Sequence, residues 1–326
     1  MSDTVSALNA AQNLDDLYKV FAANHYTAGW HKARPSLWRE PRTGFTPQHW
    51  RYKDAAVALE RAGEWIGTEL AERLNLLMCN PVGDNDYATV RTLVSAYQMI
   101  KPGEYARAHR HTPNALRLVL DAKPGLYTVV DGIRLPMNPG DVLLTPNWCW
   151  HSHYNEGKHS AIWLDFLDVP LVHLLEPMFF EEYPGGFQPV TSEPNESPFW
   201  YGIDWVRAEL QKVTAENGVR RLTLPSQQHI PTMGLSYLQI PNDAKLKVER
   251  STVSRIFAVV EGTGTATIGD LHITWERGDV FAVPSWTAFE IGASQDALLF
   301  EVSDEPVLQA LRFLRNDSAS QTTGTA

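Results

Sequence analysis

Short apolar stretches, several of them alternating with polar residues, fill two parts of the chain, residues 74–166 and 255–300. Gly, Pro and Asp separate these stretches, and successive side chains of a strand point to opposite faces, so the pattern predicts short strands joined by tight turns. The expected strands are 74–78, 89–100, 116–120, 126–130, 133–135, 142–145, 161–166, 257–260, 265–268 and 280–283. This density of short strands favours an all-β fold of antiparallel barrels or jelly rolls.

Helical spacing is confined to a few segments of the chain. Apolar residues recur every three or four positions in the segments 14–24, 55–71 and 205–212. The segment 25–50 is broken by prolines and rich in aromatic residues, and we expect it to be an extended arm that wraps over a barrel or a neighbouring subunit. Proline, glycine and acidic residues dominate 184–198, which predicts a linker or a lid.

One motif occurs twice in the chain. Gly140-Asp-Val-Leu-Leu-Thr-Pro-Asn-Trp148 matches Gly278-Asp-Val-Phe-Ala-Val-Pro-Ser-Trp286, and an internal repeat of this kind implies two barrels from one duplication. We therefore expect a helical arm that packs on the barrels (1–85), a first barrel (86–183), a linker with a helix (184–225), a second barrel (226–315) and a disordered tail (316–326).

Composition narrows the class of protein. With 326 residues, of which 44% are hydrophobic and 20% charged, the chain is long enough for two domains or one large one and can fill a hydrophobic core. A net charge of −10 argues against nucleic acid and anionic membranes as partners. Cys79 and Cys149 are too few for a disulfide framework, residues 1–13 have no signal pattern and no stretch is long enough to span a membrane. We expect a reduced, cytoplasmic protein.

Three histidines are the candidate metal ligands. His109 and His111 point the same way on a strand, and His151, 40 residues later, can supply a third nitrogen if the intervening strands fold back. Imidazoles bind iron, zinc, copper or nickel, and three on one face leave half of an octahedral ion open. A lone histidine is more often structural than a ligand, so the surrounding spacing decides.

That spacing resembles the two signatures of the cupin barrel, a double-stranded β-helix or jelly roll. Gly103 precedes His109 by five intervening residues, and Gly140 precedes Pro146 by five, with His151 and Asn155 following. Trp148 stands where the generic second signature has a glycine. In the second repeat the ligand positions hold Glu249, Ser251 and Phe289, so we expect one metal ion per chain. The expected fold is two cupin barrels with N-terminal helices and an arm.

A closer resemblance is carried by the residues around the histidines. Thr112-Pro-Asn-Ala-Leu-Arg117 follows the His pair, and Trp163-Leu-Asp-Phe-Leu-Asp-Val-Pro170 lies further on. With two barrels, the chain resembles the gentisate 1,2-dioxygenase family, which includes salicylate and 1-hydroxy-2-naphthoate ring-cleaving enzymes. The family implies Fe(II) bound by three histidines without the glutamate of generic cupins, and 112–116 indeed has no acid. Three coordination positions then remain for a bidentate substrate and O2.

The resemblance also implies roles for five further residues. Arg117 corresponds to the arginine that meets the substrate carboxylate, and it shares a face with His111 if the strand runs unbroken between them. His153 corresponds to a histidine that contacts the substrate hydroxyl or bound oxygen, and a pKa near 6.5 suits proton transfer. Asp165 is expected to steady a ligand or a neighbouring histidine. The substrate-contacting positions of the family correspond to Arg73 and Gln98.

The predicted function is therefore Fe(II)-dependent cleavage of the ring of gentisate or of another 5-substituted salicylate (5-nitro or 5-halo), between the carboxyl-bearing and hydroxyl-bearing carbons. The partners would be a small aromatic carboxylate, O2 and further copies of the chain in a homo-oligomer, a tetramer. Val94 and Ala96 replace a tryptophan and a glycine of some relatives, which leaves the 5-substituent open. Two alternatives stay open as well, a metal-dependent bicupin isomerase and a non-catalytic bicupin that binds small molecules. Three imidazoles also accept manganese.

Overall fold

A computed structural model of the protein describes residues 3–32, 35–67, 70–71 and 73–317, and the chain divides into two compact units, Met1–Arg42 and Thr43–Ala326. The first unit contains the helices α1 (Asp3–Ala10) and α2 (Leu14–Ala23). Asn13 caps α2, since its side-chain oxygen accepts a hydrogen bond from the backbone N–H of Asp16 at 3.0 Å. The helix expected at 14–24 is confirmed, whereas α1 lacks an apolar periodicity and was not predicted.

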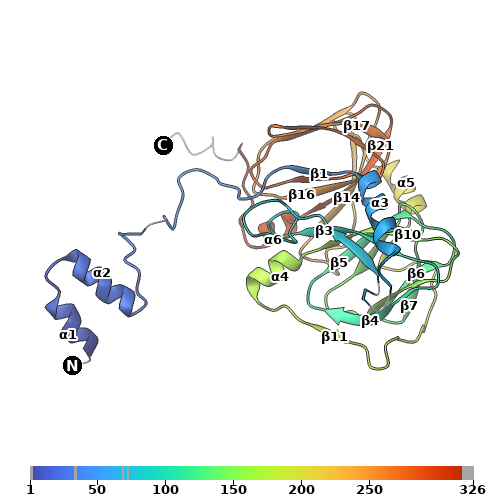
Figure 1. The fold of residues 1–326 in the computed structure, drawn as a ribbon. Coiled ribbons are helices and arrows are strands. Elements are labelled where there is room, and N and C mark those ends of the chain that lie inside the picture. The colour runs from blue at the N-terminus through green and yellow to red at the C-terminus, as the bar shows by residue number, and fades with distance from the viewer. Residues whose placement is uncertain (1–2, 33–34, 68–69, 72, 318–326) are drawn as a thin grey trace. The chain divides into compact units, whose positions relative to one another are not determined.

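The second unit holds two antiparallel barrels, which Figure 1 shows mostly in cyan to green and mostly in orange to red. In the first barrel, a sheet ordered β12-β8-β5-β10-β3-β2 faces one ordered β11-β4-β9-β6-β7 across a shared core. Its strands are β2 (Leu74–Leu77), β3 (Val94–Ile100), β4 (Tyr105–His111), β5 (Ala115–Asp121), β6 (Leu126–Val130), β7 (Ile133–Pro136), β8 (Val142–Thr145), β9 (His151–Asn155), β10 (Ala161–Leu167), β11 (Phe180–Glu182) and β12 (Trp200–Tyr201).

The second barrel repeats this plan. A sheet ordered β1-β19-β16-β21-β14-β13 shares a core with one ordered β15-β20-β17-β18. Its strands are β1 (Gln48–Trp50), β13 (Arg220–Thr223), β14 (Gly234–Ile240), β15 (Lys245–Val248), β16 (Arg255–Glu261), β17 (Thr263–Ile268), β18 (Leu271–Glu276), β19 (Val280–Val283), β20 (Phe289–Ala293) and β21 (Ala297–Ser303). The predicted all-β fold of two jelly-roll barrels is confirmed.

The two six-stranded sheets pack against each other through the largest apolar core, in which residues of β5 and β10 meet residues of β16 and β21. The barrels are also connected by the segments that precede them in the chain. Before each barrel come a strand and a helix, and the strand pairs with a sheet of the other barrel. The strand β1 and helix α3 (Tyr52–Gly63) precede the first barrel, yet β1 pairs with β19 of the second. In the same way β12 and helix α5 (Ile203–Leu210) precede the second barrel, yet β12 pairs with β8 of the first.

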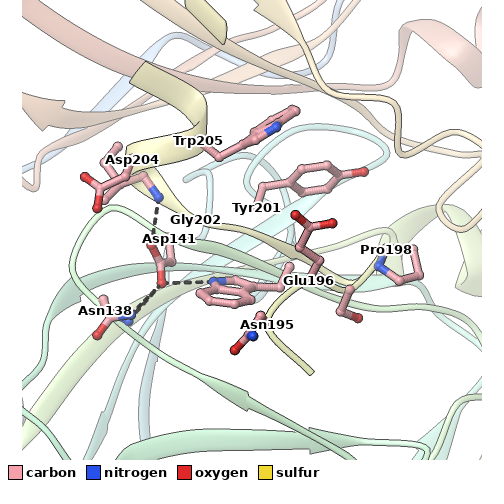
Figure 2. Close-up of a pocket in the computed structure, with 12 residues that line it drawn as sticks. Asn138, Asp141, Asn195, Glu196, Pro198, Tyr201, Gly202, Asp204 and Trp205 are labelled. Atoms are coloured by element: carbon pink, nitrogen blue, oxygen red, sulfur yellow. Dashed lines mark hydrogen bonds between the residues drawn. The ribbon is translucent and has the colours of Figure 1, made fainter. Parts of the chain in front are cut away.

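The aspartates of the repeated Gly-Asp motif anchor these two connections. Asp141 accepts hydrogen bonds from the Ile203 backbone N–H at 2.8 Å and from Trp200 Nε1 at 3.0 Å, and Figure 2 shows this carboxylate beside the start of α5. Asp279 accepts the Tyr52 backbone N–H at 2.9 Å, at the start of α3. Because each carboxylate lies at a helix N-terminus, it also interacts favourably with the helix dipole. The aspartate of each Gly-Asp motif therefore anchors the start of the helix that leads into the other barrel, α5 for Asp141 and α3 for Asp279.

Several predicted boundaries were wrong. The helix expected at 55–71 is α3, which ends at Gly63, where Lys101 Nζ donates to the last carbonyl at 3.1 Å and the backbone lies against Met99. The strand expected from residue 89 begins at Val94, because 80–90 is a loop held by the Asn80 side chain. The helix expected at 205–212 is α5, which lies two residues earlier.

Some short elements were not predicted from the sequence. The linker expected at 184–225 includes β12 and β13 besides α5, and the helices α4 (Val169–Leu175) and α6 (Glu305–Ala310) follow the last strand of each barrel. Of the tail expected to be disordered, 318–326 lies outside the described residues. In the part of the chain that the structure describes, no helix has the length and apolar character needed to span a bilayer.

Candidate metal centre and substrate cavity

The three predicted ligand histidines converge inside the first barrel. His109 and His111 lie on β4, His151 begins β9, and the two strands pair with His109 directly opposite His151. One ring nitrogen of each histidine lies within 4.8 Å of the corresponding atoms of the other two. The fold thus meets the condition stated for His151, because the strands between the two motifs fold back and place β9 beside β4.

The backbone orients all three rings in the same way. The Nδ1 atoms of His109, His111 and His151 lie 3.0, 2.8 and 3.1 Å from the carbonyl oxygens of residues two positions away. Since a carbonyl only accepts, each Nδ1 is the protonated donor and each Nε2 has a free lone pair. The Nε2 atom of His151 is buried and finds no hydrogen-bond partner among the described residues. An unpaired buried nitrogen in such a cluster is what a metal ligand requires.

Burial keeps these imidazoles neutral at pH 7. It lowers the pKa of His109 to about 4, with the charge of Arg73 adding to the effect. Burial likewise lowers the pKa of His111 and, more strongly, that of His151. A neutral imidazole is the form that binds a metal, so the three donors fit an ion such as iron, zinc, copper or nickel.

Arg117 and Asp165 form a buried ion pair beside the histidines. They are direct neighbours across β5 and β10, Arg117 Nε lies 3.3 Å from Asp165 Oδ1, and their side chains are 1% and 2% exposed. Trp163 Nε1 donates to Asp165 Oδ1 at 2.8 Å, and Arg117 Nη1 donates to Thr145 Oγ1 at 3.1 Å. Burial lowers the pKa of Arg117 to about 10, against the opposing effect of Asp165. The strand between His111 and Arg117 is broken at 112–114, so the two reach the same interior from different sheets.

His153 is the fourth histidine in the barrel interior. It is fully buried, its ring centroid lies 6.0 Å from that of His151, and neither of its ring nitrogens has a hydrogen-bond partner among the described residues. Burial, together with the positive charges of Arg117 and Arg73, holds the pKa of His153 well below its usual range. A buried neutral imidazole with two unused nitrogens can bind a ligand hydroxyl as donor or acceptor.

A cavity of about 440 Å³ opens beside the first two histidines. Arg73 lies on its wall and donates from Nε to the buried Gln98 at 2.6 Å. The lining residues are Arg73, Arg107, Ala108, His109, His111, Pro113, Leu167, Val169, Met178, Phe179, Phe180 and Glu182. Arg117, His153 and Asp165 are not among them and are buried in the barrel interior.

Known proteins resemble this chain over nearly its whole length. A family profile described as "Cupin domain" matches residues 96–167. A 5-aminosalicylate 1,2-dioxygenase of Comamonas sp is 33% identical over 94% of this chain and 90% of its own. A gentisate 1,2 dioxygenase 1 of Aquipseudomonas alcaligenes is 31% identical over 92% and 95%. The crystal structure of a salicylate 1,2-dioxygenase from Pseudaminobacter salicylatoxidans is 25% identical, with a TM-score of 0.83 over 93% and 97%.

The chain belongs to the gentisate and salicylate 1,2-dioxygenase family. It is thus an enzyme, a ring-cleaving dioxygenase, which confirms the resemblance read from the histidine motifs. The matched length is 94% of this chain, so the similarity extends to the barrel that carries no histidine triad.

In this dioxygenase the second barrel fills the ligand positions differently. Phe289, the counterpart of His151, is 3% exposed and packs in the apolar core against Phe257. Ser251 is 9% exposed, and Glu249 is exposed. The histidine triad is the one group of three metal-ligating side chains found among the described residues.

The cavity wall that follows α4 was not predicted from the sequence. Met178, Phe179 and Phe180 line the cavity because β11 pairs with β4 and places Phe180 opposite His111. The segment was read as the end of the barrel before a linker. Two adjacent phenylalanines in an otherwise acidic and proline-rich stretch were the available signal, since an exposed pair of this kind indicates an apolar binding surface.

Proposed function

We propose that the enzyme cleaves the ring of gentisate or of another 5-substituted salicylate, with Fe(II) held by His109, His111 and His151 and with O2 as co-substrate. The observation that carries the proposal is the convergence of three neutral imidazoles next to a buried arginine in a member of this family. The carbon–carbon bond between the carboxyl-bearing and hydroxyl-bearing carbons breaks, both atoms of O2 enter the product, and an open-chain dicarboxylate with a 2-oxo acid results.

Arg117 would bind the substrate carboxylate. Its Nε faces Asp165 and its Nη1 donates to Thr145, which leaves Nη2 for an incoming anion. A planar guanidinium held on two sides presents its remaining donor in a fixed direction, and that favours a planar carboxylate over other anions. Asp165 would steady this arginine from behind, so that it adds to binding through Arg117 rather than by contact with the substrate.

His153 would contact the ortho hydroxyl of the substrate. Its ring is neutral and neither nitrogen has a partner among the described residues, so one of them can accept a hydrogen bond from the hydroxyl while the substrate binds. Arg73 and Gln98 form one hydrogen-bonded unit at the cavity, and we expect them to orient the ring from the outer side. When bound, Fe(II) supplies the redox chemistry that lets O2 react with the aromatic ring, and three imidazole ligands leave room for a chelating substrate and O2.

We also propose a homo-oligomer, a tetramer, in which the arm expected at 25–50 wraps over a barrel or a neighbouring subunit. Supporting this, the first unit exposes large apolar side chains, among them Trp30 at 75% and Leu37 at 88%. Side chains of this size are usually covered in the assembled protein. Light scattering of the full chain tests the tetramer, and a monomer would contradict it.

Oxygen uptake by the anaerobically Fe(II)-loaded protein tests the reaction. Gentisate, salicylate, 5-chlorosalicylate, 5-nitrosalicylate and 1-hydroxy-2-naphthoate are offered in parallel, and one O2 per ring lost is the expected result. An Arg117→Met variant should raise KM for every carboxylate, with iron content unchanged. If iron is bound and none of the five compounds consumes oxygen, the proposed substrate class is wrong. Turnover without oxygen would favour an isomerase instead.

A further inference from the structure

Arg110 occupies an unusual place between the two ligands of β4. Its neighbours His109 and His111 face the barrel interior, so alternation turns Arg110 to the outside. There its guanidinium lies between two indole rings, 4.5 Å from the centroid of Trp148 and 4.5 Å from that of Trp150. Its Nε and Nη2 also donate to Glu181 Oε2, at 2.9 and 2.7 Å. One side chain thus joins β4, the segment before His151 and β11.

The two tryptophans connect Arg110 to the other ligands. Trp148 donates its backbone N–H to the carbonyl of His111 at 3.0 Å, and Trp150 is the residue directly before His151. Trp148 has a φ of 64°, in the left-handed region that disfavours residues with a side chain. It is the residue that stands where the generic cupin signature has glycine. The Trp148 ring packs on Arg110 and on Phe179, and these contacts help to hold the residue in this conformation.

The third partner, β11, is part of the cavity wall. In the register of β11 with β4, Glu181 lies opposite Arg110, between Phe180 opposite His111 and Glu182 opposite His109. Phe179 packs on Trp148 with a centroid distance of 4.6 Å, and Phe179, Phe180 and Glu182 line the cavity. Any movement of Arg110 would therefore move both the ligand backbone and the cavity wall.

The second barrel offers a comparison within the same chain. Trp286 matches Trp148 and has a similar φ of 58°, and Arg250 matches Arg110 and pairs with Asp317 at 2.8 Å. The position of Trp150, however, holds Ala288. The second tryptophan is therefore present only in the barrel that has the histidine triad.

We propose that Arg110 is a positioning residue of the metal centre and of the substrate cavity, because its stacking between Trp148 and Trp150 and its pairing with Glu181 hold both ligand segments and the cavity wall in one arrangement. It touches neither metal nor substrate. The proposed role in metal binding rests on the three histidines, and the proposed role in shaping the substrate cavity rests on the proposed function.

The test compares Arg110→Met with Arg250→Met, the matched change in the barrel without the triad. Metal affinity is measured by competition between the protein and a chromogenic chelator for Fe(II) and, separately, for Co(II), which needs no turnover. Since partners behind a ligand typically contribute 10–100-fold to metal affinity, Arg110→Met should weaken binding by about tenfold or more. Arg250→Met should stay within about twofold of the unchanged protein, as expected for a residue remote from the ligands.

Kinetics with gentisate at saturating Fe(II) separate positioning from a loss of folding. A displaced cavity wall removes binding that the ground state and the transition state share, so KM should rise several-fold while kcat changes less. Arg110→Lys keeps a cation between the rings and should recover at least half of the loss in metal affinity on a logarithmic scale. If the unchanged protein has no activity, the proposed function is wrong, and the chelator competition still tests Arg110.

Two results would overturn the proposal. One is a folded Arg110→Met protein whose affinity for both metals lies within twofold of the unchanged protein. The other is an equal loss in Arg250→Met, because both changes would then act through general stability. If Arg110→Met does not fold, Trp150→Ala, which copies the Ala288 arrangement, replaces it and should weaken metal binding several-fold. An unchanged affinity in Trp150→Ala also counts against the proposal.

Discussion

Replacing Asp165 by Asn tests how strongly the first barrel depends on its buried ion pair. The change keeps the shape of the side chain and leaves an oxygen to accept from Trp163 Nε1, so it removes only the charge. At the observed separation of 3.3 Å, Coulomb's law with an effective dielectric constant of about 20 gives roughly 5 kcal/mol of attraction between Arg117 and Asp165. Removing one partner of a buried pair usually costs about 3–5 kcal/mol, because the other charge stays buried without compensation.

We therefore expect Asp165→Asn to lower the free energy of unfolding by about 3 kcal/mol or more. Urea denaturation followed by tryptophan fluorescence and circular dichroism measures this quantity. In Arg117→Met/Asp165→Asn neither charge remains buried, so the double variant should be more stable than the sum of the two single changes predicts, by about 2 kcal/mol. Glu64→Gln serves as the control, because the exposed pair of Glu64 with Arg61 is worth at most about 0.5 kcal/mol.

The reasoning fails if Asp165→Asn costs less than about 1 kcal/mol, the usual effect of an average substitution. It also fails if the double-variant cycle shows no coupling between the two residues. Either result would mean that water or a rearranged Arg117 side chain compensates the charge, and that Asp165 does not hold this arginine in place.

Three further predictions follow from the site and the repeat. His151→Ala should lose the metal ion on dialysis, and metal analysis that still finds one ion per chain would exclude this triad. Because burial lowers the pKa of His109 to about 4 from the ordinary 6.5, the unfolded chain binds more protons between these values, so the stability of the metal-free protein should fall as the pH drops from 6.5 to 4. Urea denaturation midpoints at pH 7 and pH 5 measure this loss of stability, which should be smaller in His109→Gln. An equal loss of stability in the variant and the unchanged protein would contradict the role of His109. Gly278→Ala should lower the free energy of unfolding by clearly more than about 1 kcal/mol, because the new Cβ would lie 2.5 Å from the Tyr52 ring at a φ of +87°. Gly185→Ala is the control, since Gly185 has the same φ but open space around it, so this change measures the backbone strain alone. Equal melting temperatures of the two variants would refute the clash with Tyr52.

The sequence predicted the parts of the site that depend on local spacing. The His109–His111 alternation and the repeated Gly-Asp motif are properties of single strands and turns, so they survive into the structure unchanged. The resemblance to the family supplied the remaining candidate residues, and the structure places Arg117, His153 and Asp165 together in the barrel interior. Arg73 lies at the cavity and donates a hydrogen bond to the buried Gln98.

What the sequence could not predict depends on strand register and on contacts between distant segments. Asp165 was expected to steady a ligand or a neighbouring histidine, and its ion pair with Arg117, which follows from the cross-strand register, was not predicted. Residues 180–182 form a strand only because β4 offers a free edge, and nothing in their own pattern indicates this. The end of α3 at Gly63 is likewise set by Lys101 and Met99, which lie far along the chain.

The crossed connections between the barrels affect how the molecule can be divided. Since β1 and β12 each complete the sheet of the barrel that they do not precede, a cut near residue 190 would leave both half-molecules without an edge strand and with an uncovered apolar face. A domain-swapped dimer of two identical single barrels, each giving its N-terminal strand to the other, would have the same arrangement. Joining the two chains covalently would keep the two barrels paired. The barrel without the histidine triad thus supports the other barrel, because it covers that barrel's apolar face although it contributes none of the three histidines.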